Sequence, residues 1–477
     1  MALDMILPWF VLGTYCLIVL RMTPVRVTPV QFFTGRAETG SEPGLWLLVA
    51  SAAITWIFAK SIANAANLAG AFGIAGGIGY AIYYLSFLVA GVAIYLIRVR
   101  GGYGSLAQFL TSKYGPLCAR LFLIAIAIRL FNEVWSNTKV ASLYFGAEGS
   151  LEYWIGVAFI TAFTVYYSWR GGLRSSLLTD GAQMVLAAVL LAAILFVVWP
   201  GLAARGLPQI PASAQMAGIT FSGLALVQVL SYPFHDPVLT DRAFITRPRV
   251  MIKGFVLAGL LAGGFILLFS TVGLYGRAIG LAADMTVGVP ASFGLPMLLV
   301  FNAIMLTSAG STLDSTFTSA AKLSGRDWPG RANEATDRET RFGRWVMVAI
   351  ALAGNLPLLA IYFGDAVGPA IIAATTISGT MVMGLAPIFL LAFVPHAGRE
   401  SFHLAFWPGL ALGVLVTLEG ALGAEIFPAW IDIGSGAYAD DLGVNLWGLL
   451  LCTAGYLAGA ALAAIRARRR GKAGNPS

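Results

Sequence analysis

The sequence predicts an all-α polytopic membrane protein with about thirteen transmembrane helices. Its 477 residues are 58% hydrophobic and only 11% charged, whereas about a quarter of the residues in a soluble domain are charged. The charged residues cluster between apolar segments of about 18 to 28 residues, the length of a membrane-spanning helix. The alternation over about ten residues that is typical of membrane strands does not occur.

The apolar segments follow one another along the whole chain, and each span needs about twenty residues. Predicted spans begin near Met5, Gly44, Ile74, Pro116, Leu151, Ser176, Ala217, Val250, Pro290, Phe342, Gly368, His403 and Val444. Lys and Arg concentrate after the first, third, fifth, seventh and ninth segments and in the C-terminal tail. Because cytoplasmic loops carry most Lys and Arg, this alternation predicts an outside N-terminus and a cytoplasmic C-terminus. The same rule explains the net charge of +8, so the expected partner is a lipid bilayer and not nucleic acid.

Chemically reactive motifs are scarce. Cys16, Cys118 and Cys452 show no pairing pattern and are expected to pack as small apolar residues. The three histidines are too scattered for a metal site. No Walker, HExxH or GxSxG motif is present. We therefore expect neither an enzyme nor a protein with a cofactor, and the first apolar segment, which lacks a signal-peptide cleavage region, is expected to remain a helix.

Two apolar segments contain interruptions. WIFAKSIANAAN, at residues 56–67, places Lys60, Asn64 and Asn67 on one helical face. GITFSGLALVQVLSYPFHDP, at residues 218–237, is interrupted by Gly223, Gln228, Pro233 and Pro237. Five spans separate the starts of the two segments. Broken helices at corresponding places in two halves indicate an inverted-repeat transporter with a binding site near the membrane midplane.

Four stretches together resemble the sodium:solute symporter family. In chain order they are SLAQFLTSKYG at 105–115, VYYSWRGGLRSSLLTDGAQ at 165–183, YPFHDPVLTDRAFI at 232–245 and TSAGSTLDSTFTSAAKLSGRD at 307–327. They cover most of residues 44–394, and the resemblance is loosely nearest to the urea- and proline-transporting branches. It implies a LeuT-type core of two inverted five-helix repeats with an extra N-terminal helix. The implied units are an N-terminal helix and loop at 1–43, repeats at 44–200 and 201–395, and two C-terminal helices with a basic tail at 396–477.

The resemblance also implies a sodium site. By position in the family motifs, the ligands would be the hydroxyls of Ser311 and Thr312, the backbone carbonyl of Ser308 and the carboxylate of Asp180. Backbone carbonyls near Ile54 and Ile57 would complete the site. A hard cation prefers such oxygen ligands, and an unwound helix supplies carbonyls without burying much formal charge. Without the resemblance, these serines and threonines would be read as ordinary packing residues between membrane helices.

Lys60 is the residue that the resemblance does not lead us to expect. Lys60 would lie near the middle of a membrane span, where a charged side chain is costly unless it is paired with an opposite charge or hydrated. It could act as a built-in cation that replaces sodium, or bind a carboxylate or other anion of the substrate. It could also be structural, either paired with Asp180 or Asp314 or extended into a water-filled vestibule. Glu133 is a further candidate partner, although Arg129 lies four residues before it and Lys139 is near. Four residues after the seventh segment are expected to form a cytoplasmic loop cluster: His235, Asp236, Asp241 and Arg242.

The expected function is secondary active transport in a bacterial-type inner membrane, with a small polar solute moving inward together with Na⁺ by alternating access. The residues expected to face the substrate are Trp56, Lys60, Ser61, Asn64 and Gln228. Two alternatives stay open: a proton-coupled or uncoupled carrier in which Lys60 replaces the sodium ion, and a membrane sensor with the same fold. The substrate, which could resemble proline, urea, a sugar or an organic acid, and the oligomeric state are not predicted.

Overall fold

The computed structural model describes residues 3–331 and 333–473, and all regular structure within these ranges is helical. The α-helices are α1 Leu3–Met22, α2 Pro29–Thr34, α3 Leu45–Trp56, α4 Ala59–Phe72, α5 Ile74–Ile82, α6 Ser86–Gly101, α7 Leu106–Tyr114, α8 Pro116–Ser142, α9 Leu151–Arg205, α10 Ala212–Gln228, α11 Pro237–Arg242, α12 Pro248–Ala278, α13 Met285–Phe293, α14 Leu295–Lys322, α15 Asp337–Gly354, α16 Gly364–Ala374, α17 Leu385–Leu390, α18 Arg399–Leu422 and α19 Ala439–Ala473. Short 3₁₀ or π segments are η1 Tyr83–Leu85, η2 Tyr232–His235, η3 Leu323–Asp327, η4 Leu356–Tyr362 and η5 Ala429–Ile431. The all-helical prediction is confirmed.

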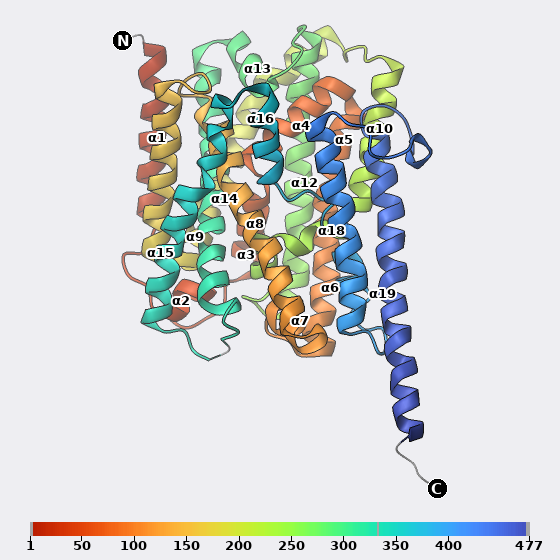
Figure 1. The fold of residues 1–477 in the computed structure, drawn as a ribbon. Helices are drawn as coiled ribbons and strands as arrows, with labels where there is room; N and C mark the ends of the chain where they lie inside the picture. The colour runs from red at the N-terminus through yellow and green to blue at the C-terminus, as the bar shows by residue number, and fades with distance from the viewer. Residues whose placement is uncertain (1–2, 332, 474–477) are drawn as a thin grey trace.

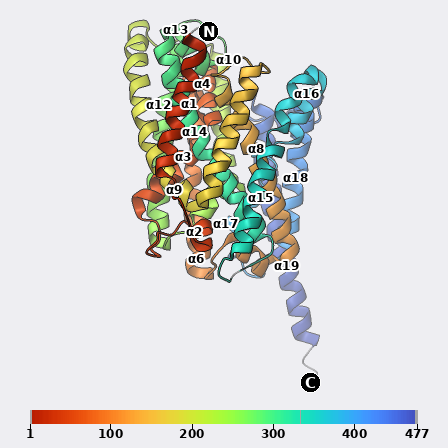
Figure 2. The ribbon, with the colours of Figure 1, turned by 90° about the vertical axis from the view of Figure 1, so that its left-hand side faces the viewer.

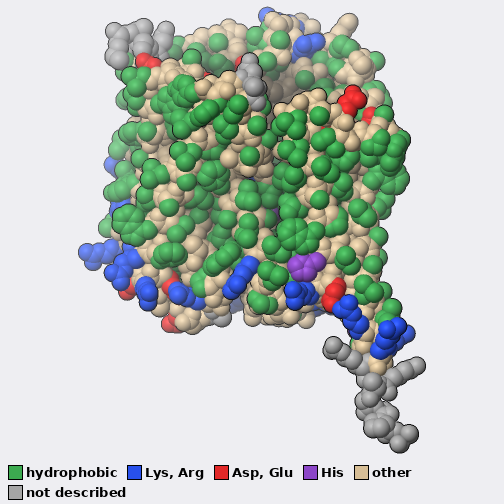
Figure 3. Space-filling model, viewed as in Figure 1, with side chains coloured by type: hydrophobic (Ala, Val, Ile, Leu, Met, Phe, Trp, Pro, Cys, Tyr) green, Lys and Arg blue, Asp and Glu red, His purple; other side chains and the backbone are tan. Residues whose placement is uncertain are grey.

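Most long helices run along a common axis, with α1 beginning at one end and α19 projecting beyond the other (Figures 1 and 2). Hydrophobic side chains cover the middle of the visible face, and Lys and Arg gather toward the end from which α19 projects (Figure 3). Among the described helices, seven are long and apolar enough to cross a membrane, or eight if the bent pair α3–α4 forms one span. These features indicate a multi-pass membrane protein.

The predicted count of thirteen spans and the orientation remain predictions. Two predicted spans fall within the 55-residue helix α9, which is kinked at Gly172. Helix α8 is 27 residues long but carries Arg129 and Glu133 in its interior, and α10 has only 17 residues. Helices that are merged, short or charged in this way do not count as separate spans when length and apolar composition are the criteria.

The kink in α9 explains the GGL motif. Gly172 has φ +52°, in the left-handed region that favours glycine. A Cβ at this position would lie 2.5 Å from the backbone oxygen of Phe32 in α2. The glycine therefore allows α2 to pack directly against the bend.

Helix α14 forms the centre of the fold and packs against α3, α8 and α9. Every residue from Ile304 to Ala321 is buried. Small side chains, with Ser and Thr among them, let the surrounding helices approach closely. The polar motif that the sequence places here therefore faces protein on all sides.

Both predicted interruptions are present. Helices α3 and α4 meet at an angle of 60°, across Ile57 and Phe58. Helix α10 ends at Gln228, and the chain continues through η2 into the short helix α11. Proline at the start of η2 and of α11 ends each preceding stretch because it lacks an N–H donor.

One prediction about the second interruption is wrong. His235, Asp236 and Arg242 are buried, with at most 1% exposure, and do not form a cytoplasmic loop cluster. The acidic and basic groups instead bond to three different partners, Asp236 to Arg129, Asp241 to Lys322 and Arg242 to Asp180. The segment has the composition of a loop, but distant helices satisfy its charges.

Candidate functional site

The break between α3 and α4 turns backbone carbonyls toward α14. The Ser308 hydroxyl donates to the Ile57 carbonyl. The Thr312 hydroxyl lies 3.4 Å from the Thr55 carbonyl and donates to the Ser308 carbonyl at 3.1 Å. The last carbonyls of a helix have no intrahelical donor, so side chains of α14 fill that role here.

This geometry refines the predicted carbonyl set. The Ile57 carbonyl is one of the two predicted carbonyls, and it accepts the Ser308 hydroxyl. The Ile54 carbonyl, in contrast, accepts the backbone N–H of Ile57 at 3.2 Å within the final turn of α3. The Thr55 carbonyl on that turn lies 3.4 Å from the Thr312 hydroxyl, and no sequence pattern separates Thr55 from its neighbours.

Asp180 on α9 lies beside these groups and is fully buried. Its Oδ1 accepts the Ser311 hydroxyl at 2.5 Å. Its Oδ2 accepts the Ser51 hydroxyl at 2.6 Å and pairs with Arg242 Nη2 at 2.9 Å. Ser51 and Arg242 are therefore part of the site, and neither was predicted.

A second buried carboxylate, Asp314, adjoins this one. It accepts hydroxyl hydrogens from four residues at 2.7 to 3.1 Å: Tyr167, Ser176, Thr179 and Ser315. Ser176 Oγ also lies 3.3 Å from Asp180 Oδ2, so this hydroxyl stands between the two carboxylates. Within the described ranges, no basic side chain lies within 4.0 Å of Asp314.

We call Asp180, Asp314 and Arg242 the α9–α14 charge cluster. With both carboxylates ionised, two negative charges and one guanidinium give it a formal charge of −1. A net charge inside a protein is costly unless a counter-ion or proton neutralises it. The cluster can therefore hold one additional monovalent cation or one proton.

Lys60 belongs to a different cluster. Its ammonium lies 2.6 Å from Glu133 Oε1, and Arg129 Nη1 lies 2.5 Å from the same oxygen. Arg129 Nη2 also pairs with Asp236 at 3.2 Å. Two cations and two carboxylates make this Lys60 cluster neutral.

The predicted partners of Lys60, Asp180 and Asp314, are wrong, because both carboxylates are held by the other cluster. The other candidate, Glu133, is the partner. The expected pairing of Glu133 with Arg129 is also present, since one carboxylate oxygen bonds to both cations. Lys139 instead pairs with Glu148 at 2.8 Å near the surface.

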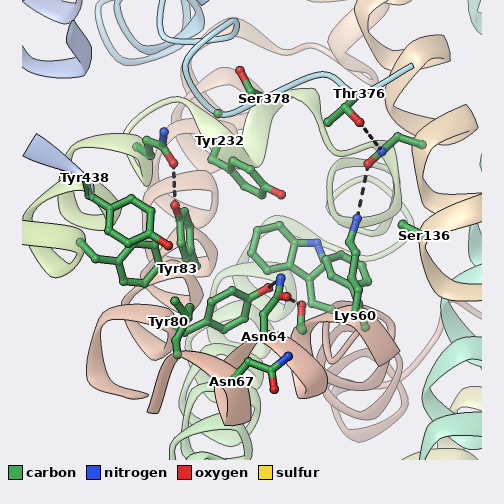
Figure 4. A pocket seen from close by; sticks show the side chains of 18 of the residues that line it. Lys60, Asn64, Asn67, Tyr80, Tyr83, Ser136, Tyr232, Thr376, Ser378 and Tyr438 are labelled. Carbon is green, nitrogen blue, oxygen red and sulfur yellow. Dashed lines mark hydrogen bonds between the residues drawn. The ribbon is translucent and has the colours of Figure 1, made fainter. Parts of the chain in front are cut away.

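A cavity of about 750 Å³ opens beside the break in α3–α4 (Figure 4). All five predicted substrate-facing residues line it: Trp56, Lys60, Ser61, Asn64 and Gln228. It reaches Asp284, next to α13, at the end of the molecule where α1 begins (Figure 1). The volume is in the range of small-molecule sites.

Tyrosines that the sequence analysis did not select also line the cavity: Tyr80, Tyr83, Tyr232 and Tyr438 (Figure 4). The Tyr80 hydroxyl donates to Ser61 at 3.0 Å, and the Tyr83 hydroxyl donates to Gln228 at 2.6 Å. These bonds orient two of the predicted polar side chains. Nothing in the spacing of the tyrosines distinguishes them from packing residues.

No family model matches the sequence, and no curated protein does. Solved structures do match. A Na⁺-coupled sialic acid symporter in a substrate-bound outward-open state has a TM-score of 0.66 and 13% identity, with 97% of this chain and 98% of that chain covered. Mhp1, a nucleobase-cation-symport-1 family transporter in a closed conformation, has a TM-score of 0.51 and 13% identity, with 92% and 95% covered.

The chain thus has the same overall fold as these two transporters. Both of these matches extend over nearly the full length of both chains. At 13% identity, the likeness concerns the fold.

Proposed function

We propose that this protein is a secondary active transporter that moves a small polar solute together with Na⁺ by alternating access. The observation that carries the proposal is the α9–α14 charge cluster. With both carboxylates ionised it has a formal charge of −1, and Asp180 bonds to Ser311 on α14 and to Ser51 on α3, the two helices that contact each other at the break. The coupled symporter among the structural neighbours provides independent support.

The proposed sodium ligands are oxygen atoms from three elements. They are the carbonyls of Thr55 and Ile57, the hydroxyls of Ser311 and Thr312, a carboxylate oxygen of Asp180, and the carbonyl of Ser308. Sodium is a hard cation, for which hydroxyl and carbonyl oxygens are suitable ligands. The ion would replace the mutual hydrogen bonds that these groups make in its absence and would neutralise the cluster.

The α3–α4 break connects the proposed ion site to the cavity. Thr55 and Ile57 present carbonyls to α14, while Trp56 lines the cavity and Lys60 follows one turn later. An ion that fixes these carbonyls also fixes the cavity wall. Such shared stabilisation makes the binding of each ligand favour the binding of the other.

Alternating access would expose this site first to one side of the membrane and then to the other. The cavity opens toward the predicted outside, so the described conformation corresponds to the outward-facing state. The repeats at 44–200 and 201–395, the outside N-terminus and the inner-membrane location belong to this proposal. The corresponding breaks in α3–α4 and in α10–α11 support the repeat assignment.

Proton coupling is the second candidate, because a proton on Asp314 or Asp180 would also neutralise the charge cluster. The version in which Lys60 replaces sodium is disfavoured, since its ammonium bonds to Glu133 and not to Asp180. A sensor with this fold would bind the solute but would not accumulate it.

The test is uptake of radiolabelled solutes into proteoliposomes under an inward gradient of Na⁺, of H⁺ or of neither. The solutes are proline, urea, sialic acid and a set of organic acids. Na⁺-dependent accumulation that Asp180→Asn abolishes and Thr307→Ala retains supports the proposal. Thr307 is on α14, but its hydroxyl bonds within its own helix. Accumulation under a proton gradient alone would support the alternative and contradict Na⁺ coupling.

A further inference from the structure

Several buried N–H groups around Lys60 have no acceptor in the described part of the protein. They are Nε1 of Trp56, Nε1 of Trp135 and Nε of Arg129. The hydroxyl of Ser136 is also unpartnered. All four residues line the cavity next to the break. Trp56 and Arg129 are each 2% exposed, so bulk solvent does not satisfy them.

Three of these groups can only donate hydrogen bonds, because indole and guanidinium nitrogens carry no acceptor. Buried polar groups without a partner are uncommon in folded proteins, and each calls for an explanation. A ligand rich in acceptors would satisfy them together. A carboxylate matches best, since it accepts at both oxygens and donates from neither.

Lys60 adds a positive charge to this donor set. Its three N–H bonds have two recorded acceptors, Glu133 at 2.6 Å and Asn132 at 3.4 Å. The side chain keeps 18% of its surface exposed, whereas that of Glu133 keeps 1%. Figure 4 shows Lys60 among the side chains that line the cavity, with its ammonium directed toward Asn132. One N–H of Lys60 thus remains available to a molecule in the cavity.

We propose that the cavity selects solutes that carry a carboxylate, which is held by Lys60 and by the indole N–H groups of Trp56 and Trp135. This inference rests on the proposed function, because it assigns the cavity to the transported solute. The substrate class is that of organic acids. The tyrosines on the remaining walls would contact the body of the solute.

The ion-pair geometry allows Lys60 to take up this role without leaving a buried charge unpaired. Glu133 Oε1 bonds to Arg129 at 2.5 Å as well as to Lys60, and its Oε2 accepts Asn137 at 2.9 Å. When the solute carboxylate binds Lys60, Arg129 and Asn137 continue to hold Glu133. Lys60 is therefore the member of the cluster that is free to exchange partners.

The experiment compares acids with their uncharged amides on the full-length purified protein in NaCl. The probes are acetate with acetamide, benzoate with benzamide, and gluconate with gluconamide, and the readout is ligand-dependent thermal stability. A ligand that binds only the folded state raises stability as its concentration passes its dissociation constant. We expect stabilisation by at least one acid at a concentration where its amide has no effect.

The matched variants are Lys60→Gln, Lys60→Arg and Lys139→Gln. We expect Lys60→Gln to weaken acid binding by about tenfold or more, since it removes a charge-assisted hydrogen bond. Lys60→Arg should retain the preference for acids, and Lys139→Gln should bind like the wild type. If Lys60→Gln does not fold, Trp135→Phe removes one donor but keeps an aromatic ring, and it should weaken acid binding severalfold.

Equal stabilisation by acids and amides, no stabilisation by any acid, or unchanged acid binding in these variants would overturn the inference. Failure of the proposed Na⁺ coupling would give a different experimental result. In that case the acid preference and its loss in Lys60→Gln persist, but replacing NaCl with choline chloride changes neither stability nor acid affinity.

Discussion

Arg242 and Asp180 form an ion pair in which both side chains are 0% exposed, with Nη2 2.9 Å from Oδ2. The same guanidinium donates to Ser51 at 2.7 Å, to Ser315 at 2.7 Å and to the Val238 carbonyl at 2.9 Å. It thus joins α3, α9, α11 and α14 at the proposed sodium site. Its charge balances only one of the two buried carboxylates.

Replacing Arg242 should destabilise the fold strongly. We expect Arg242→Ala to lower the free energy of unfolding by about 3–5 kcal/mol, because it leaves two buried carboxylates uncompensated. Arg242→Lys should recover only part of the loss, since an ammonium cannot reproduce the guanidinium's planar set of donors. Unfolding of the purified protein by a denaturing detergent measures the difference. A loss below about 1 kcal/mol, typical of an exposed ion pair, would contradict the assigned role.

Thr312→Ala should weaken sodium binding without disrupting the fold. The substitution removes a hydroxyl within 3.4 Å of the Thr55 carbonyl. We expect the NaCl concentration that half-maximally raises thermal stability to increase about tenfold or more. Thr307→Ala, on the same helix, should leave this concentration unchanged. Equal behaviour of the two variants would place sodium elsewhere.

Replacing Glu133, the carboxylate shared by Lys60 and Arg129, should strongly lower the stability of the fold. Glu133→Gln leaves the buried Arg129 and the partly exposed Lys60 with one carboxylate, that of Asp236, and we expect a loss of about 3–5 kcal/mol in unfolding free energy. The matched change Glu148→Gln breaks a pair whose side chains are 37% and 31% exposed. Such surface pairs contribute about 0–1 kcal/mol. Similar losses in the two variants would show that the Lys60 cluster is not a buried network.

Gly172→Ala should disturb the kink in α9. The new Cβ would lie 2.5 Å from the Phe32 backbone oxygen, at a φ of +52°, so we expect a loss of about 1–3 kcal/mol or more. Gly181→Ala is the control on the same helix, because its Cβ would meet only a Leu47 methyl group at 3.6 Å. A thermal-stability measurement on both variants decides the point. No difference between them would mean that α2 can move away from the bend.

The broken helices could be predicted from the sequence because the residues that mark them lie within the broken segments. Proline lacks the N–H that a continuing helix needs, which marks the second break. In the first broken segment, a lysine among apolar residues marks a helix face that must be hydrated or paired with an opposite charge. The resemblance also named Ser311, whose hydroxyl bonds to Asp180. These features can be read within one segment of chain.

The pairing of the charges could not be read in that way. Arg242 and Asp180 are separated by 62 positions, and Arg242 lies in a stretch with the composition of a loop. Asp314 is held by hydroxyls from α9 and its own helix, and not by a base. Which carboxylate Lys60 reaches depends on how α4 packs against α8, and nothing in either segment specifies that packing.

Sodium binding to the purified protein tests the central claim most directly. Equilibrium binding of radioactive Na⁺ is measured for wild type, Thr312→Ala, Asp180→Asn and the control Thr307→Ala, with K⁺ and choline as competitors. We predict saturable binding that K⁺ does not displace, that Thr307→Ala retains, and that Thr312→Ala and Asp180→Asn weaken or abolish. Absence of saturable Na⁺ binding in the wild type, or binding that both site variants preserve, would contradict the proposed coupling site.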